Sequence, residues 1–381
     1  MIPSPPWLHR LLLTTGVLLV VAFAVALLAG YTTAAQRILV ASVICLALAA
    51  TTGQGKLREM AFTVWILAGV AVGMVFHASL IKFPSWFFGL GETKLTVLII
   101  PFLQIIMFAM GATLSVSDFA RVLKMPGGVL IGLACQFTIM PLLGFALAHT
   151  MGLPPAIAAG LILVGVSPSG LASNVMSFIA RANVAMSVTM TAIATLISPI
   201  VTPLLMKALA GEMVEIHVPS MMWDMTQIVL LPVVAGLVFH HFVFHRWKPF
   251  ERLMPAISMM GILVLTVVTV APGSDKIVEV GLVLVLACFI HCTAGYALGF
   301  GVCKLLRLDT TTCRTIAIEV GMQNSGLAAG LATNLGKVAT LGLAPIVFGP
   351  IMNVTASVLA NWWRTHPVKP EGTPSATDHA P

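Results

Sequence analysis

The chain has 381 residues, of which 59% are hydrophobic and 9% are charged, and its mean hydropathy is +1.03. Because a soluble domain carries about 25% charged residues, this composition excludes a cytosolic enzyme, a disordered protein and a fibrous protein, and leaves a polytopic membrane protein. The net charge of +7 does not indicate a nucleic-acid partner, since the basic residues are scattered singly or in pairs between apolar runs.

The apolar runs predict an all-α protein. They are long and unbroken, whereas barrel strands show alternation over about ten residues, and about 20 apolar residues cross the hydrocarbon core as a helix. We expect the first span to be a retained helix rather than a cleaved signal, because a second span follows it. The expected spans are residues 11–30, 38–55, 61–81, 95–114, 127–149, 156–180, 184–210, 223–244, 254–271, 280–303, 315–335 and 338–361.

The distribution of basic residues predicts the orientation of the chain. If the N-terminus is inside, 14 Lys and Arg residues fall on the inside and 6 on the other side. This asymmetry favours both termini in the cytoplasm of a plasma (inner) membrane protein. Residues Phe83–Thr93, with three consecutive aromatic side chains, resemble an interfacial segment. The polar, Pro-rich residues 365–381 are expected to form a disordered cytoplasmic tail.

Short motifs recur in the same order in two parts of the chain. If the repeat begins near residue 61, each part holds five spans, and an odd number inverts one part relative to the other, as in secondary transporters. The expected domains are an N-terminal hairpin (1–60), two inverted repeats (61–222 and 223–364) and the tail. The recurring motifs are Gly73–His77 with Gly236–His240, Leu133–Cys135 with Leu286–Cys288, Ser169–Ala172 with Ser325–Ala328, and Pro199–Val201 with Pro345–Val347.

Two segments, Ser167–Asn174 and Glu319–Gly326, interrupt the apolar pattern at matching places. Both place helix-loosening residues beside oxygen-bearing side chains, and paired interruptions are typical of a transporter site, because freed backbone groups need partners in lipid. Carbonyls at a broken helix end can ligate a small cation, and the amides that begin the next half-helix attract an anion. For the first segment, the alternative is a simple kink that allows close packing.

Glu319 is the only carboxylate that we place well inside a span. Its burial costs on the order of several kcal/mol unless it is paired or protonated. Arg314 is one candidate partner, but a bound cation is the better one, because Gln323 and Asn324 place neutral oxygens a turn further along.

Three other polar residues in the spans are candidates for the same site. Ser187 and Thr191 are four residues apart and share a helix face, although hydroxyls in spans often only bond back to their own helix. Gln136 is the one amide deep in the span 127–149, where it could equally be an interhelical clamp.

These segments resemble the bile acid:sodium symporter family over about residues 61–365, so the first two spans lie outside the similarity. The resemblance implies ten spans in a panel domain and a core domain, with two broken helices that cross near the bilayer midplane. It rests on Met110–Phe119, Gln136–Pro141, Ser167–Asn174, Asn183–Thr191 and Glu319–Ala328.

The resemblance also implies two sodium sites and a substrate position. Asn324 would lie near the substrate. The family commonly reads Pro-Gly-Gly-Thr-x-Ser-Asn, whereas this chain has Ser169 and Leu171 at the second and fourth positions. We expect Ser169 and Leu171 to face the substrate with Asn324. The implied ligands are Ser173, Asn174, Ser187, Thr191 and Glu319 for one sodium ion, and Gln136, Glu319, Gln323 and the carbonyls of Val320 and Met322 for the other.

The sequence therefore favours a sodium-coupled symporter of a small organic anion, working by alternating access in a lipid bilayer. The main alternative is a proton-coupled carrier that uses Glu319 as its protonation site. An intramembrane enzyme is disfavoured, because the spans lack the paired Asp residues of prenyltransferases and aspartyl proteases, and His149 and His291 are the only candidates for a dyad with Ser169. A channel is disfavoured by the two matched helix interruptions.

Overall fold

The computed structural model describes residues 6–28, 32–53, 61–80, 95–115, 118, 125–243, 249–271 and 274–366. Within these residues the fold is all-helical, and the only β-type pairing is an isolated bridge between Ser169 and Gln323. The first helices are α1 (Pro6–Leu28), α2 (Thr32–Thr52), α4 (Ala61–Val75), the 3₁₀ turn η1 (Leu95–Leu98), α6 (Ile99–Thr113), α8 (Pro126–Thr150), α9 (Pro155–Val166), α10 (Leu171–Ile179) and α11 (Val184–Ala210). The remaining helices are α12 (Val218–Met225), the π-helical turn η3 (Thr226–Leu230), α13 (Leu231–Val243), α14 (Pro249–Val270), α15 (Ser274–Leu305), α16 (Thr310–Gly321), α17 (Ser325–Asn334) and α18 (Leu343–Thr365).

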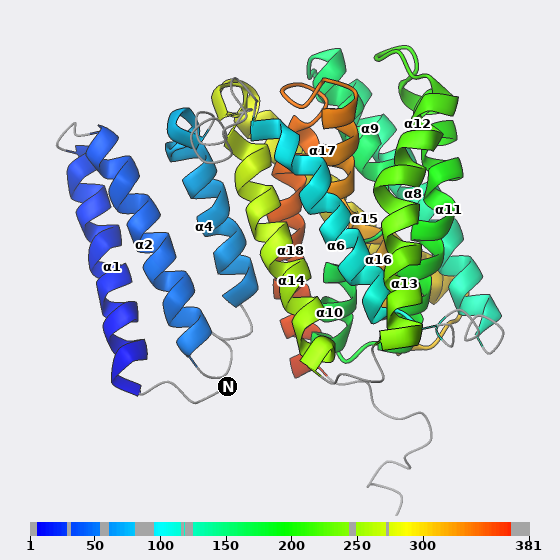
Figure 1. Cartoon of the computed structure of the whole chain (residues 1–381), viewed down its shortest axis with the longest axis horizontal. Coiled ribbons are helices and arrows are strands. Elements are labelled where there is room, and N and C mark those ends of the chain that lie inside the picture. The colour runs from blue at the N-terminus through cyan, green and yellow to red at the C-terminus, as the bar shows by residue number, and fades with distance from the viewer. Residues whose placement is uncertain are drawn as a thin grey trace, which may run out of the picture.

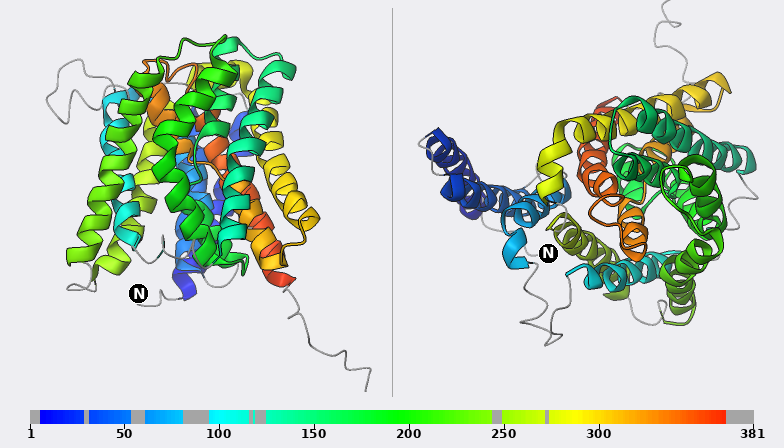
Figure 2. Two further views of the ribbon diagram at one scale, coloured as in Figure 1. Left: turned by 90° about the vertical axis from the view of Figure 1, so that its right-hand side faces the viewer. Right: turned by 90° about the horizontal axis from the view of Figure 1, so that it is seen from above.

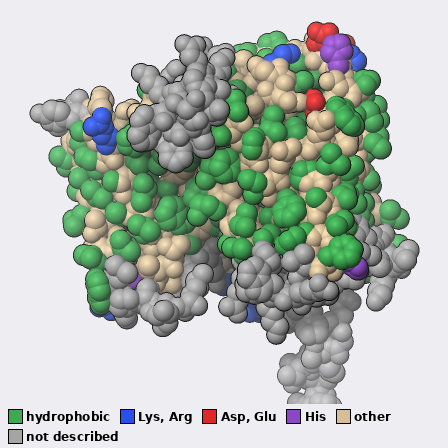
Figure 3. Space-filling model, viewed as in Figure 1, with side chains coloured by type: hydrophobic (Ala, Val, Ile, Leu, Met, Phe, Trp, Pro, Cys, Tyr) green, Lys and Arg blue, Asp and Glu red, His purple; other side chains and the backbone are tan. Residues whose placement is uncertain are grey.

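The described helices have the length and composition of membrane spans. Seven apolar segments of 18 to 27 residues are long enough to cross a bilayer, and four shorter apolar helices accompany them. Hydrophobic side chains cover the middle of the face shown in Figure 3, and charged side chains lie near its upper and lower edges. Each expected span coincides with one helix or with consecutive helices, so the chain is a multi-pass membrane protein.

The second span was placed too far along the chain. Helix α2 begins at Thr32 rather than at residue 38, so Arg37 lies inside the helix and not in a preceding loop. Its side chain is exposed near the N-terminal end of α2, where a long basic side chain can extend to the membrane surface. The expected interfacial segment Phe83–Thr93 and the tail beyond His366 lie outside the described residues, as do many of the basic residues used for the orientation.

The helices pack in three groups (Figures 1 and 2). The hairpin α1–α2 stands at one side and contacts α4 through α2. Helices α4, α14, α6 and α13 pack against one another in that order. The third group comprises α8 to α11 and α15 to α18. Its centre is formed by α9 and α16, in which nearly every side chain is buried, and the other helices of the group pack around these two. Helix α1 begins and α18 ends at the lower edge of Figure 1.

Two spans are interrupted where the sequence loses its apolar character. Helices α9 and α16 each have 12 residues, which is about 18 Å of helix, so each needs its continuation, α10 or α17, to cross a core of about 30 Å. The two interruptions meet: the amide of Asn324 donates to the carbonyl of Pro168 at 2.7 Å, beside the antiparallel bridge. The backbone groups freed at one break thus find hydrogen-bond partners at the other break, which lipid could not provide.

Candidate functional site

Glu319 lies in the last turn of α16, is fully buried, and is surrounded by hydroxyl groups. Its carboxylate accepts hydrogen bonds from Ser169 and Ser187 at 2.5 Å, from Ser173 at 2.7 Å and from Thr191 at 2.9 Å. The donors come from the first interruption, from the first turn of α10 and from α11. The fold therefore brings the predicted residues Ser173, Ser187 and Thr191 together around the carboxylate.

Asn174 completes the same group of oxygens, which we call the Glu319 cluster (Ser169, Ser173, Asn174, Ser187, Thr191 and Glu319). Its side-chain oxygen lies 2.8 Å from the hydroxyl oxygen of Ser187 and 3.3 Å from that of Thr191, the same two hydroxyls that contact Glu319. The cluster offers one negative charge and several neutral oxygens within hydrogen-bonding distance of one another. Hard oxygen ligands of this kind suit a small hard cation rather than a transition metal.

Arg314 is not the partner of Glu319. Its guanidinium donates to the backbone carbonyls of Ala180, Trp363 and His366 at 3.3, 3.1 and 2.6 Å, and it stacks over the Trp363 ring. These carbonyls lie at the C-terminal ends of α10 and α18, where a cation is favoured by the helix dipole. Among the described residues, the hydrogen-bond partners of the Glu319 carboxylate are all neutral.

A second polar group at the crossing is centred on two glutamine side chains. Gln136 of α8 donates to the side-chain oxygen of Gln323 at 2.7 Å and to the carbonyl of Ser167 at 3.1 Å, and Gln323 donates to the carbonyl of Val320 at 2.5 Å. The side-chain oxygen of Gln136 is buried and has no hydrogen-bond partner. An unpaired buried acceptor is destabilising, and a cation could satisfy it.

The structure only partly reproduces the expected second ligand set. It joins Gln136, Gln323 and the carbonyl of Val320, but the hydrogen bonds of the Glu319 carboxylate all belong to the first cluster. Met322 is buried and lies in the extended residues that follow α16. Gly321 lets this end of α16 approach α15 closely, because an added Cβ would lie 2.1 Å from the Tyr296 ring.

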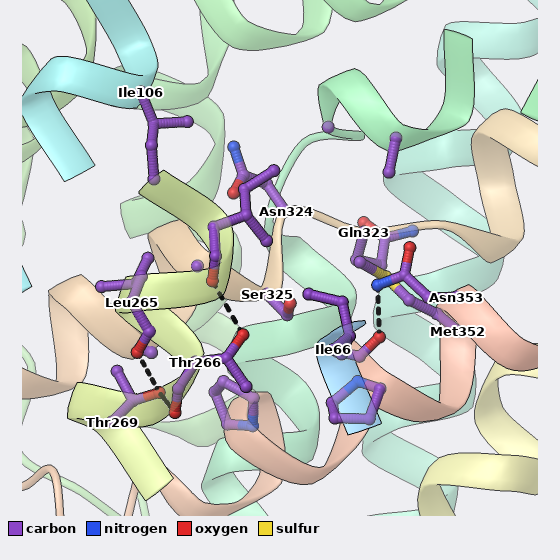
Figure 4. A pocket seen from close by; sticks show the side chains of 18 of the residues that line it. Ile66, Ile106, Leu265, Thr266, Thr269, Gln323, Asn324, Ser325, Met352 and Asn353 are labelled. Atoms are coloured by element: carbon purple, nitrogen blue, oxygen red, sulfur yellow. Dashed lines mark hydrogen bonds between the residues drawn. The ribbon is translucent and has the colours of Figure 1, made fainter. Parts of the chain in front are cut away.

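A cavity that is open to solvent lies beside the crossing (Figure 4), and its empty volume of about 750 Å³ includes open solvent. Leu171 and Asn324, two of the three residues expected to face a substrate, line it. Ser169 does not line it, because its hydroxyl is turned to Glu319. The part of the lining that comes from α4, α6 and α14 is mostly apolar. Among the described residues that line the cavity there is no Lys, Arg or His.

Two helix N-termini take the place of a basic side chain. Gly170, Leu171 and Ala172 begin α10, and residues 324–326 begin α17, and all of them line the cavity. The unpaired amides at such ends carry partial positive charge and favour an anion. The arrangement can therefore hold an organic anion by backbone groups while burying its apolar part.

Asn353 of α18 is a cavity residue that the sequence analysis missed. It is 3% exposed, its amide nitrogen donates to the carbonyl of Gly349 at 2.8 Å, and its side-chain oxygen has no partner. The sequence feature that could have identified Asn353 is a side-chain amide inside the last expected span, comparable to the amide of Gln136 in the span 127–149. The free oxygen can accept a hydrogen bond from a ligand.

Comparison with known proteins identifies the family of the chain. A family model described as the sodium bile acid symporter family matches residues 100–280. An uncharacterized sodium-dependent transporter, YocS, of Bacillus subtilis is 39% identical over 303 residues, covering 79% of this chain and 90% of the relative. The probable sodium/metabolite cotransporter BASS1 of Arabidopsis thaliana is 34% identical and covers 81% of this chain and 75% of the relative. The mouse ileal sodium/bile acid cotransporter is 29% identical, with coverage of 72% and 80%. The all-helical fold and the extent of these similarities lead to one conclusion: the chain belongs to the sodium bile acid symporter family, a family of transporters rather than enzymes.

Proposed function

We propose that this protein is a sodium-coupled symporter of an organic anion. The observation that carries the proposal is the buried carboxylate of Glu319, which is surrounded by neutral oxygens and has no basic partner among the described residues. A buried charge without a counter-ion is strongly disfavoured, so the cluster is suited to binding a cation. The names of the relatives identify sodium as their coupling ion.

Two sodium ions are proposed. One binds in the Glu319 cluster, to which Ser169 is added as a ligand. The other binds beside the unpaired oxygen of Gln136, with Gln323 and the carbonyls of Val320 and Met322, and with Glu319 contributing its charge from nearby. Because Glu319 supplies the charge for both, occupancy of one site is linked to the other.

The substrate class is an organic anion with an apolar body. Its carboxylate would lie between the N-termini of α10 and α17, and its body would contact the apolar wall. The free oxygen of Asn353 suits a hydroxyl or N–H donor on the substrate. Sodium binding is coupled to anion binding through α10. Ser173 and Asn174 lie on the first turn of this helix, so an ion bound to them fixes the helix end that holds the anion.

Alternating access is proposed to move two bodies past one another. A panel domain would comprise α4, α6, α14 and α13 with α12, and a core domain would comprise α8 to α11 and α15 to α18. The repeats would be residues 61–222 and 223–364, related by inversion, with 1–60 as an added hairpin. Helix α10 lies toward the lower edge of Figure 1 and α17 toward the upper edge, which supports this inversion. The protein would lie in the plasma membrane with both termini in the cytoplasm.

Uptake into proteoliposomes tests the proposal. Bile acids, keto acids and pantothenate-like acids would be offered with an inward sodium gradient, with potassium in its place, and with a proton gradient alone. We expect accumulation of at least one acid that requires sodium. Accumulation driven by the proton gradient without sodium would instead support the proton-coupled alternative.

A further inference from the structure

Helix α18 carries a polar stripe that continues beyond the cavity. Asn353, Ser357 and Asn361 are four residues apart, so they follow one another along one face of the helix. The cavity lining on α18 ends at Asn353, and Ser357 and Asn361 lie beyond it, toward the end of the helix at the lower edge of Figure 1. The stripe therefore leads from the cavity to the side that we assign to the cytoplasm.

The stripe is incompletely hydrogen-bonded in this conformation. Each asparagine uses its amide nitrogen on its own helix: Asn353 donates to Gly349 at 2.8 Å and Asn361 donates to Ser357 at 2.9 Å. The side-chain oxygens of both asparagines are buried without a partner. Buried acceptors are nearly always paired in folded proteins, so two unpaired oxygens on one stripe indicate groups that meet water or a ligand in another conformation.

A hydrogen bond between distant parts of the chain covers the middle of this stripe. The hydroxyl groups of Thr63 on α4 and Ser357 on α18 are 2.9 Å apart, and both side chains are buried, at 2% and 1% exposure. Phe62 and Ile66, which flank Thr63 on α4, line the cavity. Thr63 and Ser357 thus meet at the boundary of the cavity, on the side toward which the stripe runs.

We propose that the seam between α4 and α18 is a closed passage from the cavity to the cytoplasm, with the Thr63–Ser357 hydrogen bond as its latch. In the open conformation α4 separates from α18, and the oxygens of Asn353 and Asn361 become solvated along the route of the departing anion. This inference rests on the proposed transport function and topology. It assigns the latch to two hydroxyls, which form a bond weak enough to break in every cycle.

Cysteine accessibility tests the passage without requiring a known substrate. The six native cysteines would be replaced by alanine, and Asn353→Cys would be introduced as the reporter. Inside-out membrane vesicles would be treated with a charged, membrane-impermeant methanethiosulfonate, and the rate of modification measured. A control reporter, Ala194→Cys, occupies an equally buried position (1% exposed) on α11, away from the seam.

We expect Asn353→Cys to react and Ala194→Cys to remain unreactive. Thr63→Val is nearly isosteric and removes the hydroxyl, so it should raise the reaction rate about fivefold, the factor expected for the loss of one hydrogen bond. Thr63→Ser keeps the hydroxyl and should keep the rate close to that of the parent. This rescue separates the hydrogen bond from a general loosening of α4.

Three results would overturn the proposal. These are an unreactive Asn353→Cys, equal reactivity of the two reporters, and a Thr63→Val rate equal to that of the parent. Sodium-driven uptake is measured separately on the cysteine-free parent, which keeps Asn353 and Thr63, so that the two proposals stay distinguishable. Loss of sodium coupling with the expected labelling pattern would remove the proposed function and leave the passage in place. Sodium-driven uptake with an unreactive Asn353→Cys would remove the proposed passage and leave the proposed function in place.

Discussion

The two helix interruptions look alike in sequence but supply different chemistry. Both contain a Ser-Gly-Leu-Ala motif, and they pair with each other through the bridge between Ser169 and Gln323. The first interruption and the helix after it supply hydroxyls and one amide oxygen, whereas the second supplies the carboxylate of Glu319. The difference teaches that the proposed ion site is divided between the two interruptions, so neither of them supplies all of its ligands alone.

The N-termini of α10 and α17, which follow the two interruptions, also differ. Asn324 caps α17 with its own side chain, which accepts from the amide of Leu327 at 3.0 Å. Gly170 precedes α10 and offers no side-chain cap. The first amides of α10 are therefore more available to an anion in the cavity. The first interruption is suited to holding the substrate, and the second to holding the charge that attracts sodium.

The largest expected effect comes from removing that charge. Glu319→Ala should reduce sodium-driven uptake at least about 100-fold, because neutral oxygens alone do not compensate an ion for its lost hydration. Proteoliposome uptake measures this, with Glu319→Gln as the matched variant of similar shape. Full sodium-dependent uptake by Glu319→Ala would remove the second interruption from the ion site. An active Glu319→Gln that had lost its pH dependence would favour proton coupling.

The inversion of the two halves can be tested by the positions of two loops. Arg181 follows α10 and Asn334 ends α17, and both side chains are exposed. In a background without native cysteines, we expect Arg181→Cys to react with an impermeant thiol reagent from the cytoplasmic side and Asn334→Cys from the outside. The rates from the two sides should differ at least about tenfold, because the bilayer excludes a charged reagent. Reaction of both from one side would contradict the inversion.

Removing one neutral ligand that lies outside the second interruption should weaken sodium binding less than removing Glu319. Ser187→Ala and Gln136→Ala should each raise the sodium concentration for half-maximal uptake about tenfold, since a hydrogen-bonding partner of a charged group is worth about 1.5–3 kcal/mol. Ser198→Ala is the control, because its buried hydroxyl on the same helix as Ser187 only bonds back to Thr195 at 2.8 Å. An equal shift in the control would indicate a general effect of hydroxyl removal.

Ser169 distinguishes the sodium role from the substrate role within the first interruption. Ser169→Ala should raise the sodium half-saturation about fivefold and leave the ranking of carboxylate substrates unchanged, because the hydroxyl contacts Glu319 and not the cavity. Ser167→Ala is the control, since that buried hydroxyl bonds back to Leu163 at 2.7 Å. A changed substrate ranking with unchanged sodium dependence would return Ser169 to the substrate side.

Leu171 should show the opposite and smallest effect. Leu171→Thr places a hydroxyl at the cavity wall, so it should shift relative uptake toward hydroxylated carboxylates by about threefold to fivefold. The sodium half-saturation should stay near that of the parent, because Leu171 is not part of the Glu319 cluster. Competition between two carboxylates in one uptake assay measures the ratio directly. An unchanged ratio together with a lower melting temperature would show that Leu171 only packs against the neighbouring helices.

Sequence reasoning predicted most of the helices, because apolar length alone specifies a span when lipid leaves no other way to satisfy the backbone. It placed the start of the second span too late, because Arg37 suggested a loop although its long side chain can reach the membrane surface from within a helix. It identified Glu319 as exceptional from the cost of burying a carboxylate. The hydroxyls around it were nominated by helix spacing and by the family resemblance.

What the sequence determined by itself was therefore the membrane fold, the two interruptions and the presence of one carboxylate well inside a span, since these follow from local composition. Only the tertiary structure decided which polar groups meet. It turned Ser169 to Glu319 rather than to the cavity, placed Arg314 on the ends of α10 and α18, and left the oxygens of Gln136 and Asn353 unpaired. The physical reason is that hydrogen-bond partners in the crossing come from segments whose paired residues are 13 to 187 positions apart, and no local pattern specifies how such segments align.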